Sequence, residues 1–114
     1  MLPAAASLTS SESFRRCVRA GRRAGGRTVV VHLDASIDDT ASEPFCRVGF
    51  VVGRDVGGAV TRNRVRRRLR HLVRARLDEL PAGVMVVRAL PASAGADFPE
   101  LRDDLARCLG RVLP

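Results

Sequence analysis

The residues best suited to do chemistry in this sequence are arginines crowded into one short segment. Residues 59–77, AVTRNRVRRRLRHLVRARL, contain eight arginines and no acidic residue. The guanidinium group is planar, so it can bind phosphate oxygens in pairs and stack on bases. A helix that is cationic only for solubility normally carries acids among its cations. The segment therefore predicts a surface that binds a polyanion.

The element that must position these arginines is an amphipathic helix. Apolar residues recur at helical spacing from Val65 to Leu80, and Pro81 follows, which predicts a helix over residues 61–80. At about 100° per residue, one face opposite the apolar stripe holds Asn63, Arg67, Arg70 and Arg74. Arg64, Arg68 and His71 fall on one flank of that face, and Arg66 falls on the other.

The overall charge of +8 also favours an anionic partner, either nucleic acid or a membrane surface. A membrane-bound helix would expose bulky apolar residues opposite its cations, whereas this apolar stripe is suited to cover a sheet. A helix-turn-helix would need a second short helix beside the basic one, but predicted strands flank the basic helix on both sides. No spacing of Cys and His residues fits a zinc finger. RNA is the favoured partner, and no membrane partner is expected.

The residue types of a protein nuclease are present but not assembled. Hydrolysis of nucleic acid needs clustered carboxylates for metal ions or a paired general acid and base. His32 and His71 share no motif, and the Asp pairs at 38–39 and 103–104 fall in a predicted loop and a predicted helix. We predict no catalytic residue, no metal site and no cofactor bound by the protein alone.

The cysteines and the first residues indicate the compartment. Cys17, Cys46 and Cys108 are odd in number and lack metal-ligand spacing, which predicts small buried thiols in a reducing environment. MLPAAASLTS lacks the basic start and apolar core of a signal peptide. We expect a cytoplasmic protein with a single domain over residues 1–114, monomeric when free because its charge repels further copies.

The other elements complete an α/β (α+β) two-layer sandwich. A capping box at Thr9 to Glu12 opens a short helix that Gly21 ends. An acidic loop, DASIDDTASEP, separates two strands, and a nearly continuous apolar run forms a buried third strand before a last helix opened by Asp97. The predicted order is αββαβα, with strands at 27–33, 45–53 and 84–90 and the later helices at 61–80 and 98–112. These two helices should cover one face of the sheet and leave part of the other open as a cleft.

Residues 47–74, RVGFVVGRDVGGAVTRNRVRRRLRHLVR, strongly resemble the protein component of bacterial ribonuclease P. The family's hallmark is R-N-R entering a basic helix after a glycine-rich turn, here Arg62, Asn63 and Arg64. The resemblance continues through LPAGVMVVRALP and covers nearly the whole chain. It implies that the strand, basic helix and strand form a left-handed crossover, although about 98% of such connections are right-handed.

The resemblance also implies a function. In this family a large RNA subunit performs the hydrolysis, and the protein secures the 5′ leader of pre-tRNA during tRNA 5′ maturation. The expected partners are therefore the catalytic RNA and pre-tRNA, and Mg²⁺ is expected as a requirement of the holoenzyme. The chain is then a subunit of an endoribonuclease and carries no catalytic residue itself.

Two sets of site residues follow from the resemblance, position by position. The helix face that meets the catalytic RNA is expected at Arg62, Asn63, Arg64, Arg67, Arg68 and Arg70. The leader cleft is expected at Phe14, Val18, Val30, His32, Arg47, Val51 and Arg54. For Phe14, simple core packing is an almost equal alternative. Val18 and His32 stand where the family commonly has aromatic residues, and Asp55 interrupts a usually basic turn, so weaker leader binding is expected.

Two other functions remain open on the sequence. A general RNA-binding or ribosome-associated protein without a ribozyme partner would bind many RNAs equally. A metal-dependent protein nuclease has little support, because it would need an acidic cluster that the sequence lacks.

Overall fold

The computed structural model describes residues 11–35 and 46–113. The predicted capping box begins at Thr9, outside the described residues, and most of the predicted acidic loop is outside them as well. The α-helices are α1 (Ser11–Ala20), α2 (Ala59–Ala75) and α3 (Phe98–Val112). The strands are β1 (Arg22–Gly25), β2 (Val29–Asp34), β3 (Cys46–Val51) and β4 (Gly83–Ala89). Short 3₁₀ turns occur at η2 (Leu77–Glu79) and η3 (Pro91–Ala94).

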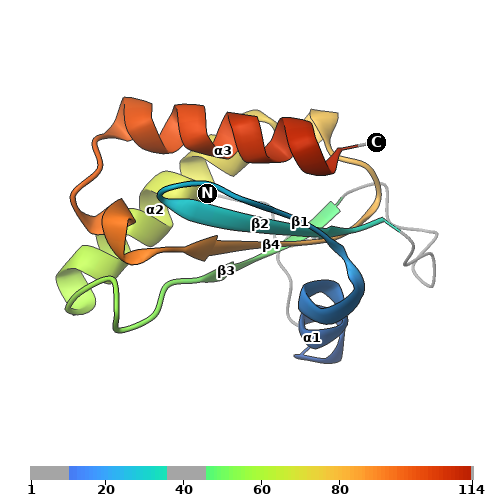
Figure 1. The fold of residues 1–114 in the computed structure, drawn as a ribbon, viewed down its shortest axis with the longest axis horizontal. Helices are drawn as coiled ribbons and strands as arrows, with labels where there is room; N and C mark the ends of the chain where they lie inside the picture. Colours follow the sequence, from blue (N-terminus) through green and yellow to red (C-terminus); the bar gives the residue numbers. More distant parts are fainter. Residues whose placement is uncertain (1–10, 36–45, 114) are drawn as a thin grey trace.

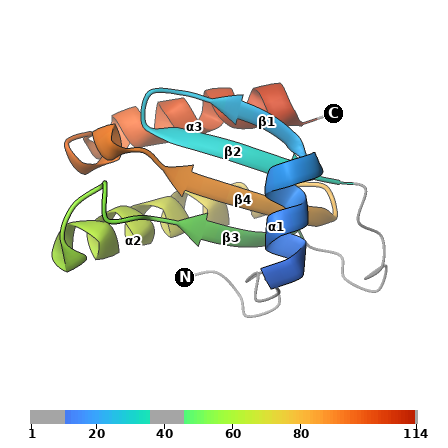
Figure 2. The ribbon, with the colours of Figure 1, turned by 60° about the horizontal axis from the view of Figure 1, so that its bottom comes forward.

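The four strands form one mixed sheet in the order β1-β2-β4-β3. β2 pairs antiparallel with both β1 and β4, while β3 runs parallel to β4. Helices α2 and α3 cover one face, and α1 crosses one end of the other face (Figure 1). Figure 2 shows α2 behind parallel strands β3 and β4, an arrangement in which the β3-α2-β4 crossover is left-handed. The implied handedness and the sandwich architecture are confirmed.

Alternation along the strands separates two cores. Residues such as Val31, Val48 and Met85 point toward α2 and α3 and belong to the main core. The intervening positions Val84 and Val86 point toward α1 and form a smaller core with Cys17. Because α1 spans only ten residues, it covers only part of this second face.

β1 is a strand that the sequence analysis did not predict. Its four residues, RRAG, contain no β-branched or aromatic side chain, and only Ala24 is buried. The strand forms because it pairs with β2, placing Arg22 opposite Leu33 and Gly25 opposite Val30. Tertiary pairing therefore overrides a weak local preference. The other three strands lie where they were predicted, with ends shifted by one or two residues.

The basic helix is shorter than the predicted 61–80. It begins earlier, at Ala59, and ends at Ala75, after which Arg76 leaves helical geometry with φ −116° and ψ 10°. The apolar spacing continues because Leu77 and Leu80 are three residues apart, which suits the three residues per turn of η2. Leu80 is buried. Because the hydrophobic stripe continues from α2 into η2, the sequence pattern did not indicate where the α-helix gives way to a 3₁₀ helix.

Two glycines permit close approaches between elements. A side chain at Gly21, which follows α1 as predicted, would meet the Cys17 carbonyl oxygen at 2.6 Å and the Leu33 carbonyl oxygen at 2.7 Å. Gly83 has φ +143° and would meet the Asp34 carbonyl oxygen at 2.5 Å. These contacts hold α1 and β4 tightly against β2.

A buried carboxylate joins the β1-β2 hairpin to α3. Asp104 accepts hydrogen bonds from the Thr28 backbone N–H at 2.7 Å and the Thr28 hydroxyl at 2.5 Å. It also accepts one from Arg107 at 2.9 Å. Burial alone would raise the pKa of Asp104, but the Thr28 hydrogen bonds and Arg107 lower it overall.

We predict that Asp104→Asn lowers the free energy of unfolding by about 1–3 kcal/mol, since it disrupts charge-assisted hydrogen bonds in a buried site. The matched control is Asp103→Asn on the exposed face of α3, which should change it little. The pKa of Asp104 is lower in the folded protein than in the unfolded chain. Its contribution to the free energy of unfolding is therefore fully present above the pKa of the unfolded state, and it is lost as the pH falls through the pKa of the folded state. Urea unfolding of both variants between pH 7 and pH 3 measures this; equal losses in the two variants would contradict it.

Candidate nucleic-acid interface

The exposed face of α2 carries the first candidate surface. Val65, Leu69, Leu72 and Val73 are buried against the sheet side, which fixes the rotation of the helix. The opposite face is exposed as the helical spacing predicts. We call this face the arginine ridge and define it as Asn63, Arg67, Arg70 and Arg74.

The charge of the arginine ridge is not compensated by acids. Within residues 11–35 and 46–113, the ion pair recorded on or beside α2 joins Arg76 to Glu79, beyond the end of the ridge. α2 has no acidic residue in its first turn, and Gly58 provides no side-chain cap. The described part of the chain therefore presents these guanidinium groups unneutralised.

Backbone carbonyls hold the arginines on one flank of the ridge. Arg64 Nη2 donates to the Ala94 carbonyl oxygen at 3.0 Å, and Arg68 Nη1 donates to the Ala96 carbonyl oxygen at 3.3 Å. Both acceptors lie in or just after η3. A carbonyl restricts the side chain without removing its charge, and each guanidinium keeps other donors for a further acceptor.

The other flank faces edge strand β3. The Arg70 guanidinium carbon lies 5.9 Å from the centroid of the Phe50 ring, a cation–π distance. Arg66 Nη1 donates to Asn63 Oδ1 at 3.1 Å. Arg62 is half-buried, and its Nε has no hydrogen-bond partner among the described residues. The three residues of R-N-R thus occupy three different sides of the helix.

A depression of about 550 Å³ lies along the ridge. It is lined by Asn63, Arg66, Arg67, Arg70 and His71. The His71 ring lies 5.9 Å from the Phe98 ring, centroid to centroid, at the start of α3. The depression is therefore lined by five cationic or polar side chains, and one of them, His71, contacts the ring of Phe98.

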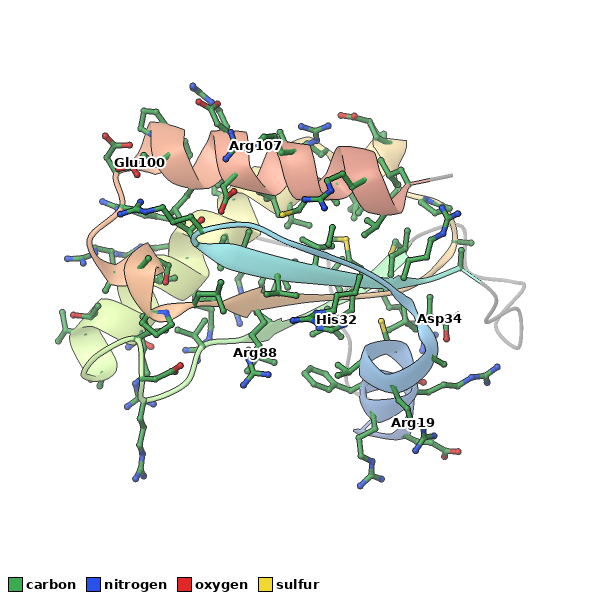
Figure 3. The ribbon with its side chains drawn as sticks, in the orientation of Figure 1. Arg19, His32, Asp34, Arg88, Glu100 and Arg107 are labelled. Atoms are coloured by element: carbon green, nitrogen blue, oxygen red, sulfur yellow. The ribbon has the colours of Figure 1, made fainter. Side chains whose placement is uncertain are left out.

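The second candidate surface lies on the opposite face of the sheet, beside α1. A hollow of about 400 Å³, which we call the sheet hollow, is lined by Val18, Arg23, Val30, His32, Asp55, Arg88 and Leu90. Figure 3 shows His32 and Arg88 on the side of the sheet that faces away from α3. Of the predicted cleft residues, Val18, Val30 and His32 are brought together here.

The remaining predicted cleft residues lie around the sheet hollow and not in its lining. Phe14 and Val51 are partly buried and pack on the small core beneath α1, so the packing alternative for Phe14 holds in part. Arg47 is half-buried on β3, opposite Val84. Arg54 is exposed in the turn after β3, and its neighbour Asp55 lines the hollow instead.

Sequence reasoning missed Arg23 and Arg88 as site residues. Arg23 lies on the unpredicted strand β1, directly opposite His32. The run at 84–90 was predicted to be a buried strand, but Arg88 is exposed within it. Arg88 shares a face with Val84 and Val86 by simple alternation, which is the signal that could have identified it.

Burial shifts the titration of groups near this face. It lowers the pKa of His32 below the ordinary 6.5, and the nearby charges of Arg23 and Arg88 lower it further. Burial and, to a smaller extent, the negative charge of Asp34 raise the pKa of Cys17 to about 11. The three cysteines are free and buried, as predicted.

Residues 11–35 and 46–113 contain no group of three or more His, Cys, Asp or Glu side chains arranged to hold a metal ion. Over the same residues, no helix combines the length and the hydropathy needed to cross a bilayer.

Comparison with known proteins identifies the family. The family model described as Ribonuclease P matches residues 2–113. The chain belongs to the ribonuclease P protein family. The "Ribonuclease P protein component" of Acidothermus cellulolyticus is 53% identical over 113 residues, covering 98% of this chain and 92% of that protein. The protein of the same name from a Nocardioides species is 55% identical, covering 98% and 95%. The family gives the chain a role in ribonuclease P, as a subunit of this tRNA-processing enzyme, and implies an RNA partner.

Solved structures share the fold at lower identity. A Staphylococcus aureus RNase P protein mutant "with defective mRNA degradation activity" has a TM-score of 0.83 at 21% identity, covering 94% of this chain and 87% of that one. The RNase P protein from Thermotoga maritima has a TM-score of 0.78 at 24% identity, covering 95% and 98%. The ribonuclease P protein fold is therefore present here.

Repulsion among the guanidinium groups of the arginine ridge should lower the free energy of unfolding of the free protein. Arg67 has Arg64 and Arg70 at three-residue spacing, and like charges so placed repel by about 0.2–0.5 kcal/mol per pair. Arg67→Ala should therefore raise the free energy of unfolding by about 0.5 kcal/mol at low salt, and the gain should fade in high salt.

Arg102→Ala is the matched control because Arg102 lies exposed on α3 beside Asp103. It should give no such gain. Denaturant unfolding at two salt concentrations measures both variants, and a salt-independent gain, or an equal gain in the control, would contradict an uncompensated ridge.

Proposed function

We propose that this chain is the RNA-binding subunit of ribonuclease P, docking on the catalytic RNA through α2 and holding the 5′ leader of pre-tRNA at the sheet hollow. In this proposal the protein promotes endonucleolytic removal of the leader, and the RNA subunit supplies the bond-breaking chemistry. The site of action is the cytoplasm.

The observation that carries the proposal is the arginine ridge, for which residues 11–35 and 46–113 provide no carboxylate partner. Phosphate groups would remove the repulsion among its guanidiniums and release the counterions that accompany RNA. Arg64 and Arg68, already restrained by the η3 carbonyls, lose less freedom on binding than unrestrained side chains would. Of the predicted ribozyme-facing residues, Asn63, Arg67 and Arg70 belong to this ridge and Arg64 and Arg68 flank it. Arg62 falls on the side of the helix that carries the apolar stripe, at its first turn.

The sheet hollow suits a single strand of RNA. Arg23 and Arg88 provide positive charge for the backbone, while Val18 and Val30 provide apolar surface for sugars and bases. Among the described residues, the lining contains no Phe, Tyr or Trp on which bases could stack, its one aromatic ring is the largely buried His32, and Asp55 contributes a carboxylate. Both features support modest affinity for the leader.

The residues of the described chain do not fit a resident metal ion, because no three candidate ligands converge. The Mg²⁺ requirement that we propose belongs to the holoenzyme.

The first test is reconstitution. Pure protein added to its cognate catalytic RNA should lower the magnesium concentration at which pre-tRNA is trimmed, and the protein without that RNA should cleave nothing. Absence of stimulation, together with equal binding of many unrelated RNAs, would instead favour a general RNA-binding protein.

The second test separates the two surfaces. Arg67→Ala on the ridge should weaken assembly with the catalytic RNA about tenfold, as expected for the loss of one charge-assisted phosphate contact. Arg88→Gln in the sheet hollow should leave assembly nearly unchanged and reduce the preference of the holoenzyme for leader-bearing pre-tRNA over mature tRNA.

Arg102→Gln, on the outer side of α3, is the control for a generic loss of positive charge. Affinities for both RNAs are measured by titration with each variant. If Arg67→Ala and Arg88→Gln lower the same affinity to the same extent, the assignment of two separate surfaces is wrong.

A further inference from the structure

His32 is a titratable group enclosed in the sheet hollow. Its side chain is on the α1 side of β2 and the residue is only 6% exposed. Its Nδ1 atom is buried and has no hydrogen-bond partner among the described residues. No described group therefore fixes a proton on this nitrogen or stabilises a charged ring through it.

The charges around His32 come from several elements. β1 contributes Arg23 directly opposite, and β4 contributes Arg88 two residues beyond the paired Val86. The turn after β3 contributes Asp55, while α1 contributes the apolar Val18. On α1, Arg19 lies on the side turned away from the sheet (Figure 3).

The charges that shift the pKa of His32 are those of Arg23 and Arg88. At the register of His32 and Val86, β3 contributes the uncharged Gly49, and Arg47 lies two residues away on the same face, opposite Val84. Asp34, two residues along β2, lies 3.8 Å from the Arg16 guanidinium. In the absence of an anion, burial, Arg23 and Arg88 keep the pKa of His32 low and its ring neutral.

An RNA phosphate in the hollow would reverse this balance. It would offset the charges of Arg23 and Arg88 and place a negative charge beside the ring, and an opposite charge within about 4–6 Å favours the protonated form. The occupant is a phosphodiester strand because the hollow pairs two guanidiniums with the apolar Val18 and Val30. Protonation takes one H⁺ from solvent onto the free ring nitrogen and changes no covalent bond.

We propose that His32 takes up a proton when the leader strand enters the sheet hollow, so that recognition of the leader strengthens as pH falls. This inference rests on the proposed function, which assigns the hollow to the leader. The direction of the effect follows from linkage between protonation and binding. Lowering the pH strengthens binding in the range between the titration midpoint of His32 in the free protein and its higher midpoint in the complex. The effect is at most about tenfold per pH unit for one proton.

The test measures the affinity of the reconstituted holoenzyme for leader-bearing pre-tRNA and for mature tRNA, between pH 5.5 and 8, under conditions that block cleavage. The ratio of the two affinities should rise severalfold as pH falls below 6.5 for the natural sequence. It should be flat for His32→Phe, which keeps a ring without a titrating nitrogen, and for His32→Asn. The rise should persist in His71→Asn, which removes the other histidine of the chain.

A leader preference that is present but independent of pH, or a rise that survives in His32→Phe, would overturn the role of His32 alone. Equal affinities for the two RNAs at every pH would overturn the proposed function as well. Proton NMR of the free full-length chain provides a test without RNA. It contains only two histidines, and His71→Asn assigns their signals. The His32 signal should titrate below 6.5, and a midpoint at or above that value would contradict the proposal.

Discussion

The structure depends on an apolar stripe strong enough to hold a helix of like charges against a sheet. Val65, Leu69, Leu72 and Val73 are buried, and burying such side chains contributes about 1.5–3 kcal/mol each for the larger ones. Repulsion between neighbouring arginines is about 0.2–0.5 kcal/mol per pair. Because the gain from burial exceeds this repulsion, the helix remains folded although the described residues place no neutralising acid on the ridge. Its positive face is therefore available to a partner.

The sheet separates two surfaces with different chemistry. On the α2 side the arginines project from the helix, and the backbone carbonyls of Ala94 and Ala96 restrain two of them. On the α1 side, a short helix leaves part of the sheet open, and Arg23, His32 and Arg88 converge in the hollow from three strands. We propose that one face recognises a folded RNA and that the other recognises a single strand. The left-handed crossover and the antiparallel strands place these two surfaces on opposite faces of one four-stranded sheet.

The sequence predicted most of the fold because its patterns were strong. Apolar periodicity located α2, the capping residue Asp97 located α3, and the alternation on β2 placed Val30 and His32 on one face. β1 escaped prediction because its residues have little strand preference and form a strand only through pairing. Arg23 and Arg88 were missed for related reasons, since one lies on that strand and the other interrupts an apolar run. Which arginines the η3 carbonyls would restrain depends on tertiary contacts that no local pattern encodes.

The most direct test of the central claim is the salt dependence of binding between the free protein and its cognate catalytic RNA. If the ridge and its flanks neutralise about six phosphates, the logarithm of the association constant should fall against the logarithm of the salt concentration with a slope of about −4 to −5. A slope near zero would mean that the arginines of α2 do not meet phosphates, and the account would be wrong.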